Sequence, residues 1–118
     1  MTRQQQLIAW TESILDITQR WKNKNIHVKI SLTDRDFDRH GTSFTHFSMI
    51  FNSFYIRTSG VRMMFSGKNN ELVEVSTDFL TQVEIIENNL ENLIIFTEKL
   101  GESELKQTIF RKTTLLLL

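Results

Sequence analysis

The chain has 118 residues, of which 40% are hydrophobic and 24% charged, with no cysteine, no proline and a formal net charge of zero. This composition is typical of a globular protein, so we expect a single domain over residues 1–118. The lack of cysteine excludes disulfides, a thiol nucleophile and a cysteine-ligated zinc site. No apolar segment approaches the roughly 20 residues that span a bilayer, so we expect a cytoplasmic protein with no membrane partner.

The charge is unevenly distributed along the chain. Residues 1–70 carry ten Lys or Arg and five Asp or Glu, whereas residues 71–118 carry four and nine. A neutral total argues against non-specific nucleic-acid binding as the main role. The opposite net charges of residues 1–70 and 71–118 indicate that the basic half contacts the acidic half, either within one chain or between two chains. The abundance of Asn, Ile, Lys and Phe is associated with the AT-rich genomes of many bacteria and phages.

The N-terminal segment is predicted to form a helix over residues 4–22. Its apolar residues recur at spacings of three and four, which places them on one stripe of a helix. Thr2 is suited to the N-cap, and the polar stretch 22–25 ends the helix. The stripe consists of Leu7, Trp10, Ile14, Ile17 and Trp21.

The middle of the chain is predicted to form four or five antiparallel strands. Residues 26–32 alternate between apolar and polar side chains, which is the period of a strand with one exposed face. Further strands are expected over 43–51, 54–58, 61–65 and 71–75, because these segments are rich in aromatic and β-branched residues. Turns are expected at 52–53, 59–60 and 66–70.

The last third of the chain shows apolar residues at helical spacing. A long helix is therefore predicted over 78–100, with Gly101 as its C-terminal stop, followed by another helix over 102–116. The expected fold class is α+β: an N-terminal helix, an antiparallel meander of four to five strands, and two C-terminal helices packed on one face of the sheet.

The expected long helix also suggests a binding surface. Like charges spaced three or four residues apart repel on a helix, so an acidic row favours a basic neighbour. Large apolar residues beside that row would remain exposed, which indicates a protein partner. We therefore predict a non-enzymatic regulator, inhibitor or immunity-type protein, acting as a homodimer. The predicted contact residues are Glu84, Glu87, Glu91 and Glu98 with Ile85, Ile95 and Phe96.

The stretch 33–46 combines aspartates, arginines and histidines. The three aspartates of this stretch have the spacing of the first three ligands of an EF-hand calcium loop. The sixth loop position, which requires glycine, is Arg39, and the twelfth, which requires glutamate, is Thr45, so an EF-hand is excluded. The preferred interpretation is a mixed-charge surface loop. The alternative is a metal-dependent enzyme, and its candidate ligands are Asp34, Asp36, Asp38, His40 and His46. If the strands carrying His27 and His46 pair, these two imidazoles become neighbours.

No glycine-rich phosphate loop or nucleophile motif is present, so we predict no enzymatic activity and no cofactor. A helix–strands–helix order is shared with double-stranded-RNA-binding domains, but the lysine cluster of those domains is missing. Nucleic-acid binding is the alternative function, because basic residues surround a tryptophan and continue onto the expected sheet. The residues concerned are Arg20, Trp21, Lys22, Lys24, Lys29, Arg57 and Arg62.

Overall fold

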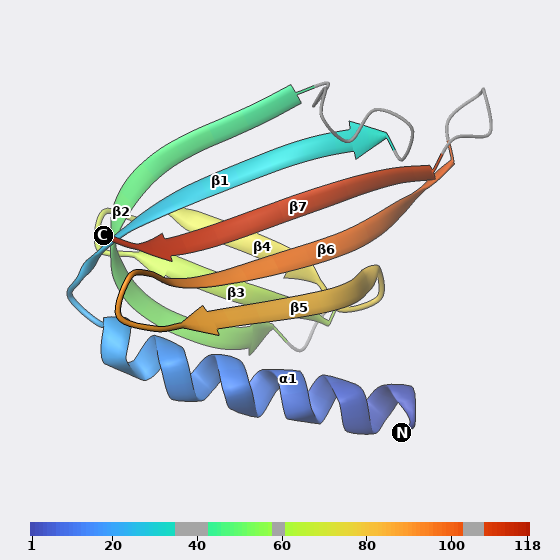
Figure 1. Ribbon diagram of the computed structural model, residues 1–118, viewed down its shortest axis with the longest axis horizontal. Helices are drawn as coiled ribbons and strands as arrows, with labels where there is room; N and C mark the ends of the chain where they lie inside the picture. The colour runs from blue at the N-terminus through green and yellow to red at the C-terminus, as the bar shows by residue number, and fades with distance from the viewer. Residues whose placement is uncertain (35–42, 58–60, 103–107) are drawn as a thin grey trace.

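The computed structural model describes residues 1–34, 43–57, 61–102 and 108–118, and this part of the chain folds into one α-helix, a short 3-10 turn and seven strands (Figure 1). None of the described helices is long and apolar enough to cross a membrane. The elements in chain order are α1 (Arg3–Thr18), η1 (Gln19–Trp21), β1 (Asn25–Asp34), β2 (Ser43–Arg57), β3 (Arg62–Gly67), β4 (Leu72–Ser76), β5 (Leu80–Glu87), β6 (Asn92–Glu102) and β7 (Thr108–Leu117).

The predicted N-terminal helix is confirmed. Thr2 caps it through a capping box, in which the Thr2 hydroxyl accepts from the Gln5 amide and the Gln5 side chain accepts from the Thr2 amide. The buried side of the helix and the turn that follows it includes Ile14, Ile17 and Trp21. The predicted apolar stripe therefore faces the core.

All seven strands belong to one antiparallel sheet with the order β4-β3-β2-β1-β7-β6-β5. Strands β1 to β4 follow one another outward to one edge of the sheet. The chain then crosses to the opposite edge and returns through β5 and β6 to β7, which pairs with β1. The two edge strands, β4 and β5, are therefore consecutive in sequence.

The sheet curls so that its two edges meet at residues 77–79. The Ser76 amide at the end of β4 donates to Glu98 Oε2 on β6 at 3.0 Å, and the Lys99 amide donates to the Phe79 carbonyl at 2.8 Å. Side chains on the inner face pack across the enclosed space; the rings of Phe65 on β3 and Phe96 on β6 lie 5.2 Å apart. The hydrophobic core lies within this curl.

Helix α1 lies along the open side of the curl (Figure 1). At its N-terminal end, Arg3 donates to the carbonyls of Thr77 and Leu80, at 2.6 and 2.5 Å. At its C-terminal end, Arg20 forms ion pairs with Asp16 and with Glu87 at the end of β5. These contacts fix both ends of the helix beside β5 and complete the core on that side.

The predicted fold class is wrong. The structure has a seven-stranded sheet and one long helix, not a meander of four to five strands followed by two helices. Segment 78–100 forms most of the β5–β6 hairpin, and the second predicted helix, 102–116, overlaps β7, which covers 108–117. Apolar residues occupy both faces of these strands, so they also match helical spacing by coincidence. The β-branched residues that fill the strands were the opposing signal.

Local signals explain the turns that replaced the predicted helices. Asn88 Oδ1 accepts from the amides of Leu90 and Glu91, both at 2.8 Å, which closes the β5–β6 turn. Gly101 does not end a helix: it adopts φ +146° at a register shift between β6 and β7, a backbone conformation that favours glycine.

Two further turn predictions had different outcomes. The turn predicted at 66–70 is confirmed, since β3 ends at Gly67 and β4 begins at Leu72. The turn predicted at 52–53 is a register shift within the continuous strand β2, between Phe51 and Ser53. A bulge lets a long strand bend without ending, so β2 pairs with β1 along its first part and with β3 along its second.

Candidate interaction surface

The outer face of strands β1, β7, β6 and β5 carries two ordered rows of side chains. Strand register places one residue from each strand side by side in a row, and alternation places every second residue on this face. The apolar row is His27, Leu116, Leu93 and Ile86. The charged row is Lys29, Thr114, Ile95 and Glu84.

Apolar side chains form the middle of this face. Ile86, Ile95 and Leu116 are partly exposed, and Leu93 between them retains 8% of its accessible surface. In the described part of the chain no helix or strand covers the outer face of these strands (Figure 1). We call the eight residues of the two rows the outer-face patch.

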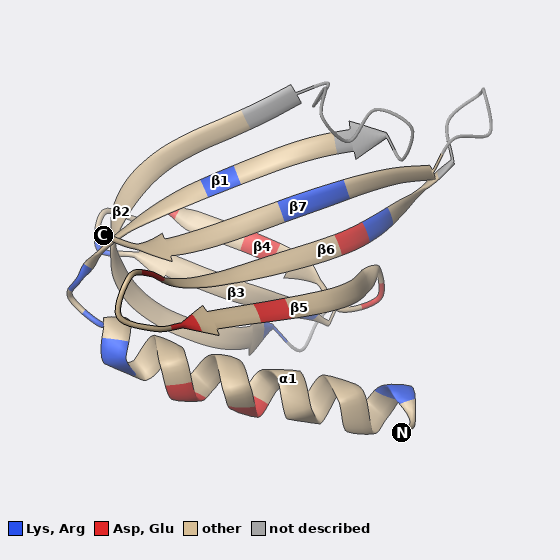
Figure 2. Ribbon diagram, viewed as in Figure 1, with Lys and Arg blue, Asp and Glu red and all other residues tan. Residues whose placement is uncertain are grey.

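The two ends of the charged row have opposite charges. Lys29 on β1 and Glu84 on β5 are both exposed, and strand register places them at opposite sides of the patch. Figure 2 shows a basic segment on β1 and acidic segments on β5, with β7 and β6 between the two strands. Three strand spacings separate them, about 14 Å, so they are too far apart to pair within one chain. Glu84 accepts a hydrogen bond from Gln82 Nε2 at 2.8 Å.

The four glutamates predicted to form one acidic row do not lie together. Glu84 is on the outer face, Glu87 ends β5 in the ion pair with Arg20, and Glu91 is exposed in the β5–β6 turn. Glu98 is completely buried on the inner face. The predicted row required a helix; in strands, alternation and the turn separate its members.

The three predicted apolar contact residues also separate. Ile95 lies on the outer face as expected for a contact residue. Phe96 is completely buried in the core, so it is not available to a partner. Ile85 pairs with the buried Ile94 and remains 37% exposed near the sheet edge. Consecutive residues of a strand point to opposite faces, and this accounts for the division.

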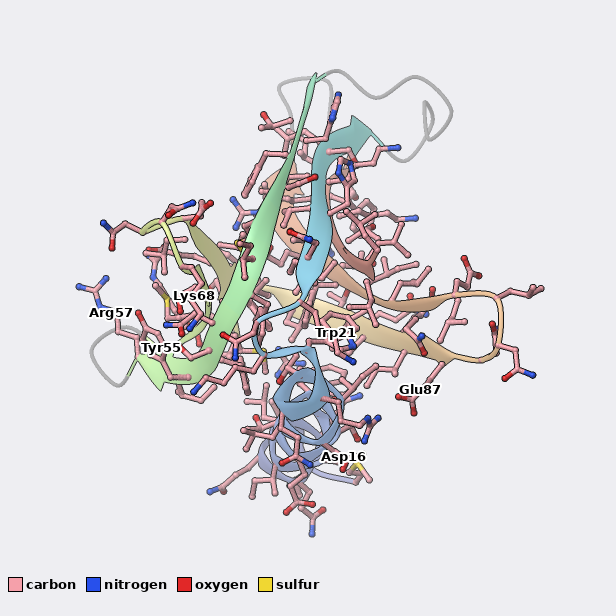
Figure 3. The ribbon with its side chains drawn as sticks, turned by 90° about the vertical axis from the view of Figure 1, so that its left-hand side faces the viewer. Asp16, Trp21, Tyr55, Arg57, Lys68 and Glu87 are labelled. Carbon is pink, nitrogen blue, oxygen red and sulfur yellow. The ribbon has the colours of Figure 1, made fainter. Side chains whose placement is uncertain are left out.

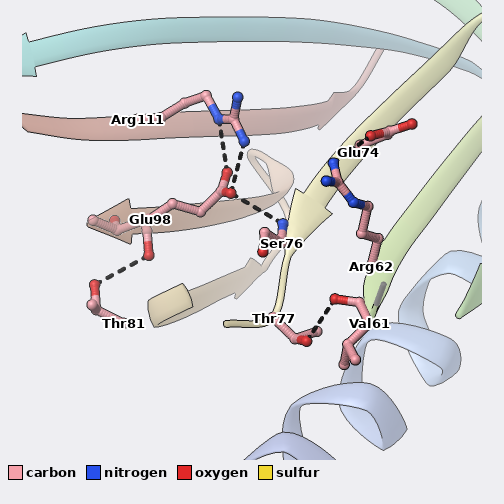
Figure 4. Close-up of polar contacts among 9 residues, drawn as sticks. Val61, Arg62, Glu74, Ser76, Thr77, Thr81, Glu98 and Arg111 are labelled. Atoms are coloured by element: carbon pink, nitrogen blue, oxygen red, sulfur yellow. Dashed lines mark hydrogen bonds and ion pairs between the residues drawn. The ribbon is translucent and has the colours of Figure 1, made fainter. Parts of the chain in front are cut away.

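The buried carboxylate of Glu98 accepts hydrogen bonds from two other strands on the inner face (Figure 4). Arg111 on β7 donates to it in a bidentate pair at 2.9 and 2.8 Å, and the Ser76 amide supplies a third donor. The hydrogen bonds that Arg111 donates to Glu98 raise the pKa of Arg111, so the guanidinium stays charged. This cluster links β4, β6 and β7, and sequence periodicity gave no indication of it.

The predicted basic surface is divided in a similar way. Trp21 is buried, so it offers no exposed ring for a base to stack on. Arg20 is engaged with Glu87 and Asp16, and these hydrogen bonds raise its pKa. Lys22 and Lys24 are exposed in the connection between η1 and β1, whereas Lys29 belongs to the outer-face patch.

Arg57 and Arg62 lie together at the other end of β2. They are directly opposite each other on β2 and β3, and Arg62 also pairs with Glu74 at 2.9 Å. Figure 3 shows Arg57, Tyr55 and Lys68 on the same side of the molecule, away from Asp16 and Glu87. Tyr55 is 45% exposed beside them. Tyr55 was not singled out as a site residue from the sequence.

Two hollows follow the side of α1 that faces β2, each with a volume of about 260 Å³. Both have apolar walls, and Ile8 and Leu15 protrude beside them at 52% and 49% exposure. One hollow is lined by Gln4, Leu7, Ile8, Thr11, Glu12, Ile56, Val61 and Thr77. The other is lined by Leu15, Thr18, Gln19, Lys22, Phe51, Asn52, Ser53 and Phe54.

The stretch 33–46 lies largely outside the described residues. Asp36, Asp38 and His40 fall in the undescribed segment 35–42, and Asp34 is placed only by its backbone at the end of β1. His46 lies on β2. The predicted His27–His46 neighbourhood is confirmed, with ring centres 5.5 Å apart.

Comparisons with known proteins give one structural likeness. No family model matches the chain, and no curated protein sequence matches it. The fold is similar to the crystal structure of the Bacillus subtilis YojF protein, with a TM-score of 0.58 and 11% sequence identity, over 91% of this chain and 89% of that one. At this identity, the likeness to YojF is one of fold alone.

Proposed function

We propose that this chain is a non-enzymatic protein-binding protein that acts in the cytoplasm as a homodimer, with the outer-face patch as its contact surface. The supporting observation is the arrangement of charge around an apolar centre. Lys29 stands at one side of the patch and Glu84 at the other, with Ile95 and Thr114 between them. Such a surface is complementary to a second copy of itself.

The complementarity follows from symmetry. Most homodimers have a twofold axis, and both copies then use the same patch. If that axis runs parallel to the strands between two facing sheets, it reverses the strand order of the second copy. Lys29 of one chain then faces Glu84 of the other, and the same pair forms a second time. Opposite charges at these positions favour this register over others.

The apolar row reinforces this arrangement. Reversal of strand order places Leu116 over Leu93 of the second copy and His27 over its Ile86. Facing sheets pack about 10 Å apart through side chains of this size. Burial of a fully exposed side chain of this size contributes about 1.5–3 kcal/mol, and each of these partly buried side chains contributes the fraction that is still exposed. The centre of the patch thus supplies affinity, and its charged sides supply orientation.

Reversal of each charge tests the proposal. Lys29→Glu alone and Glu84→Lys alone create two repulsive contacts per dimer, so each variant should be monomeric at concentrations where the unmodified chain is dimeric. An equimolar mixture of the two variants restores both attractive contacts and should form a heterodimer. Sedimentation velocity would measure the oligomeric state of each variant alone and of their mixture.

The mixture separates an intermolecular contact from a folding defect. Lys29 and Glu84 do not touch within one chain, so damage to either chain's fold would not be repaired by mixing. Lys112→Glu is a matched control, because Lys112 lies on the same face in the next row; it should reduce association less. A monomeric unmodified chain at high micromolar concentration, or a mixture that stays monomeric, would contradict the proposed dimer.

Nucleic-acid binding is the second candidate, and the Arg57–Arg62 pair favours it. Like charges directly opposite on paired strands are unfavourable, and a phosphate between them removes the repulsion. The exposed Tyr55 ring nearby provides a surface on which a base can stack. Fluorescence anisotropy with a single-stranded oligonucleotide should then show salt-dependent binding that Arg57→Ala weakens and Lys112→Ala does not.

A further inference from the structure

The two histidines on the outer face have the geometry of a shared metal site. His27 on β1 pairs with Ser48, and His46 on β2 pairs with Lys29, so the imidazoles are diagonal neighbours on adjacent strands. Their ring centres are 5.5 Å apart and their planes are inclined by 46°. His46 is exposed and His27 is partly exposed. Both rings therefore lie on a surface that an ion can reach.

This separation suits two ligands of one ion. An imidazole nitrogen binds Zn²⁺ at about 2 Å, so two imidazoles that share a tetrahedral ion have ring centres about 5 Å apart. We propose that His27 and His46 together bind a divalent transition-metal ion of the zinc, copper or nickel class, with water completing its coordination. Imidazole suits these ions and does not suit Mg²⁺ or Ca²⁺, which require oxygen ligands.

The strands hold the pair in place before any ion arrives. Backbone register fixes the spacing of the two histidines, so little conformational entropy is lost on binding. His27 Nδ1 lies 3.4 Å from Ser48 Oγ, a contact that orients this ring and leaves Nε2 for the ion. Lys29, the register partner of His46, carries a positive charge that opposes a cation. Its presence limits the affinity of the site.

The site does not need the proposed dimer. Both ligands come from one chain, but His27 belongs to the outer-face patch and would face Ile86 of the second copy, whereas His46 lies beyond the patch. The Glu84→Lys variant, which should be monomeric, leaves His27 uncovered and should bind the ion at least as well as the unmodified chain, which separates the two proposals. A protein that never dimerises can still bind the ion, and a dimer can exist without it.

Isothermal titration calorimetry with ZnCl₂ tests the site on the full chain. We expect one ion per chain, and either His27→Gln or His46→Gln should lower the affinity about tenfold or more. His40→Gln is the matched control, because it removes the third histidine of the chain and should leave the affinity unchanged. Lys29→Gln should increase the affinity, since it removes the opposing charge.

Electron paramagnetic resonance of the Cu²⁺-loaded chain identifies the ligands. Two equivalent imidazole nitrogens should give a coupling pattern that reduces to one nitrogen in each single-histidine variant. The inference is overturned if Zn²⁺ does not bind at high micromolar concentration, or if His27→Gln leaves the affinity unchanged. It is also overturned if His40→Gln abolishes binding, because the two-histidine pair would then not be the ligand set.

Discussion

The two faces of strand β6 differ sharply although they are made by alternate residues of one segment. On the inner face, Phe96 and Glu98 are completely buried, one in the aromatic core and the other in a bidentate pair with Arg111. On the outer face, Ile95 is partly exposed within the outer-face patch. The inner face determines stability, and the outer face is available for association. Neighbours in sequence thus have separate physical roles.

The largest expected difference is between Phe96 and Ile95. Phe96→Ala leaves a cavity against Phe65 and should lower the free energy of unfolding by about 3–5 kcal/mol. Ile95→Ala removes a partly exposed side chain and should cost about 1 kcal/mol. Urea denaturation in the Glu84→Lys background keeps association from contributing. Equal losses at the two positions would remove the distinction between the faces.

The next comparison is between two glutamates. Glu98→Ala removes the partner of Arg111 and the acceptor of the Ser76 amide, and should lower the free energy of unfolding by about 3 kcal/mol. The Arg111 side chain is 32% exposed, so water can partly solvate its charge in the variant. The loss of stability should therefore lie at the low end of the roughly 3–5 kcal/mol expected when one partner of a buried ion pair is removed. Glu84→Ala should change stability by no more than about 0.5 kcal/mol. Thermal unfolding monitored by circular dichroism would measure both variants.

For a third pair of neighbours, Thr113 and Thr114, the substitution on the inner face should stabilise the protein instead of destabilising it. Thr113 is buried on the inner face, and within the described part of the chain its hydroxyl has no hydrogen-bond partner. Thr113→Val removes this unsatisfied group while keeping the shape, and should stabilise the protein by about 1 kcal/mol. Thr114→Val on the outer face should be close to neutral. A destabilised Thr113→Val variant would show that the hydroxyl is satisfied after all.

The smallest effect concerns salt. Raising the ionic strength from low to physiological values screens exposed charges, so it should weaken the proposed Lys29–Glu84 contact between chains and increase the dissociation constant of the proposed dimer several-fold. The buried Glu98–Arg111 pair is screened less, so the unfolding free energy of the monomeric variant should change little. Dissociation measured by sedimentation at two salt concentrations, beside matched urea curves, separates the two responses.

Local physics specifies several features of this chain. The capping residue Thr2 and the stripe from Leu7 to Trp21 are sufficient to specify the N-terminal helix, since each signal acts within a few residues. Alternation in 26–32 likewise specified β1, and the turn after Gly67 followed from its composition. The adjacency of His27 and His46 was expected only on the condition that their strands pair, and the register of β1 and β2 meets that condition.

Long-range contacts specify the secondary structure of the last third of the chain and the faces of its strands. Residues 80–102 and 108–117 have apolar side chains in both strand and helical periods, so local pattern did not distinguish the two. Pairing of β7 with β1 and of β6 with β7 selects strands, because it satisfies their backbone groups and buries Leu115 on β7 and Phe96 on β6. That pairing also buried Glu98 and left Glu84 exposed. Long-range contacts therefore determined which of the predicted surface residues can meet a partner.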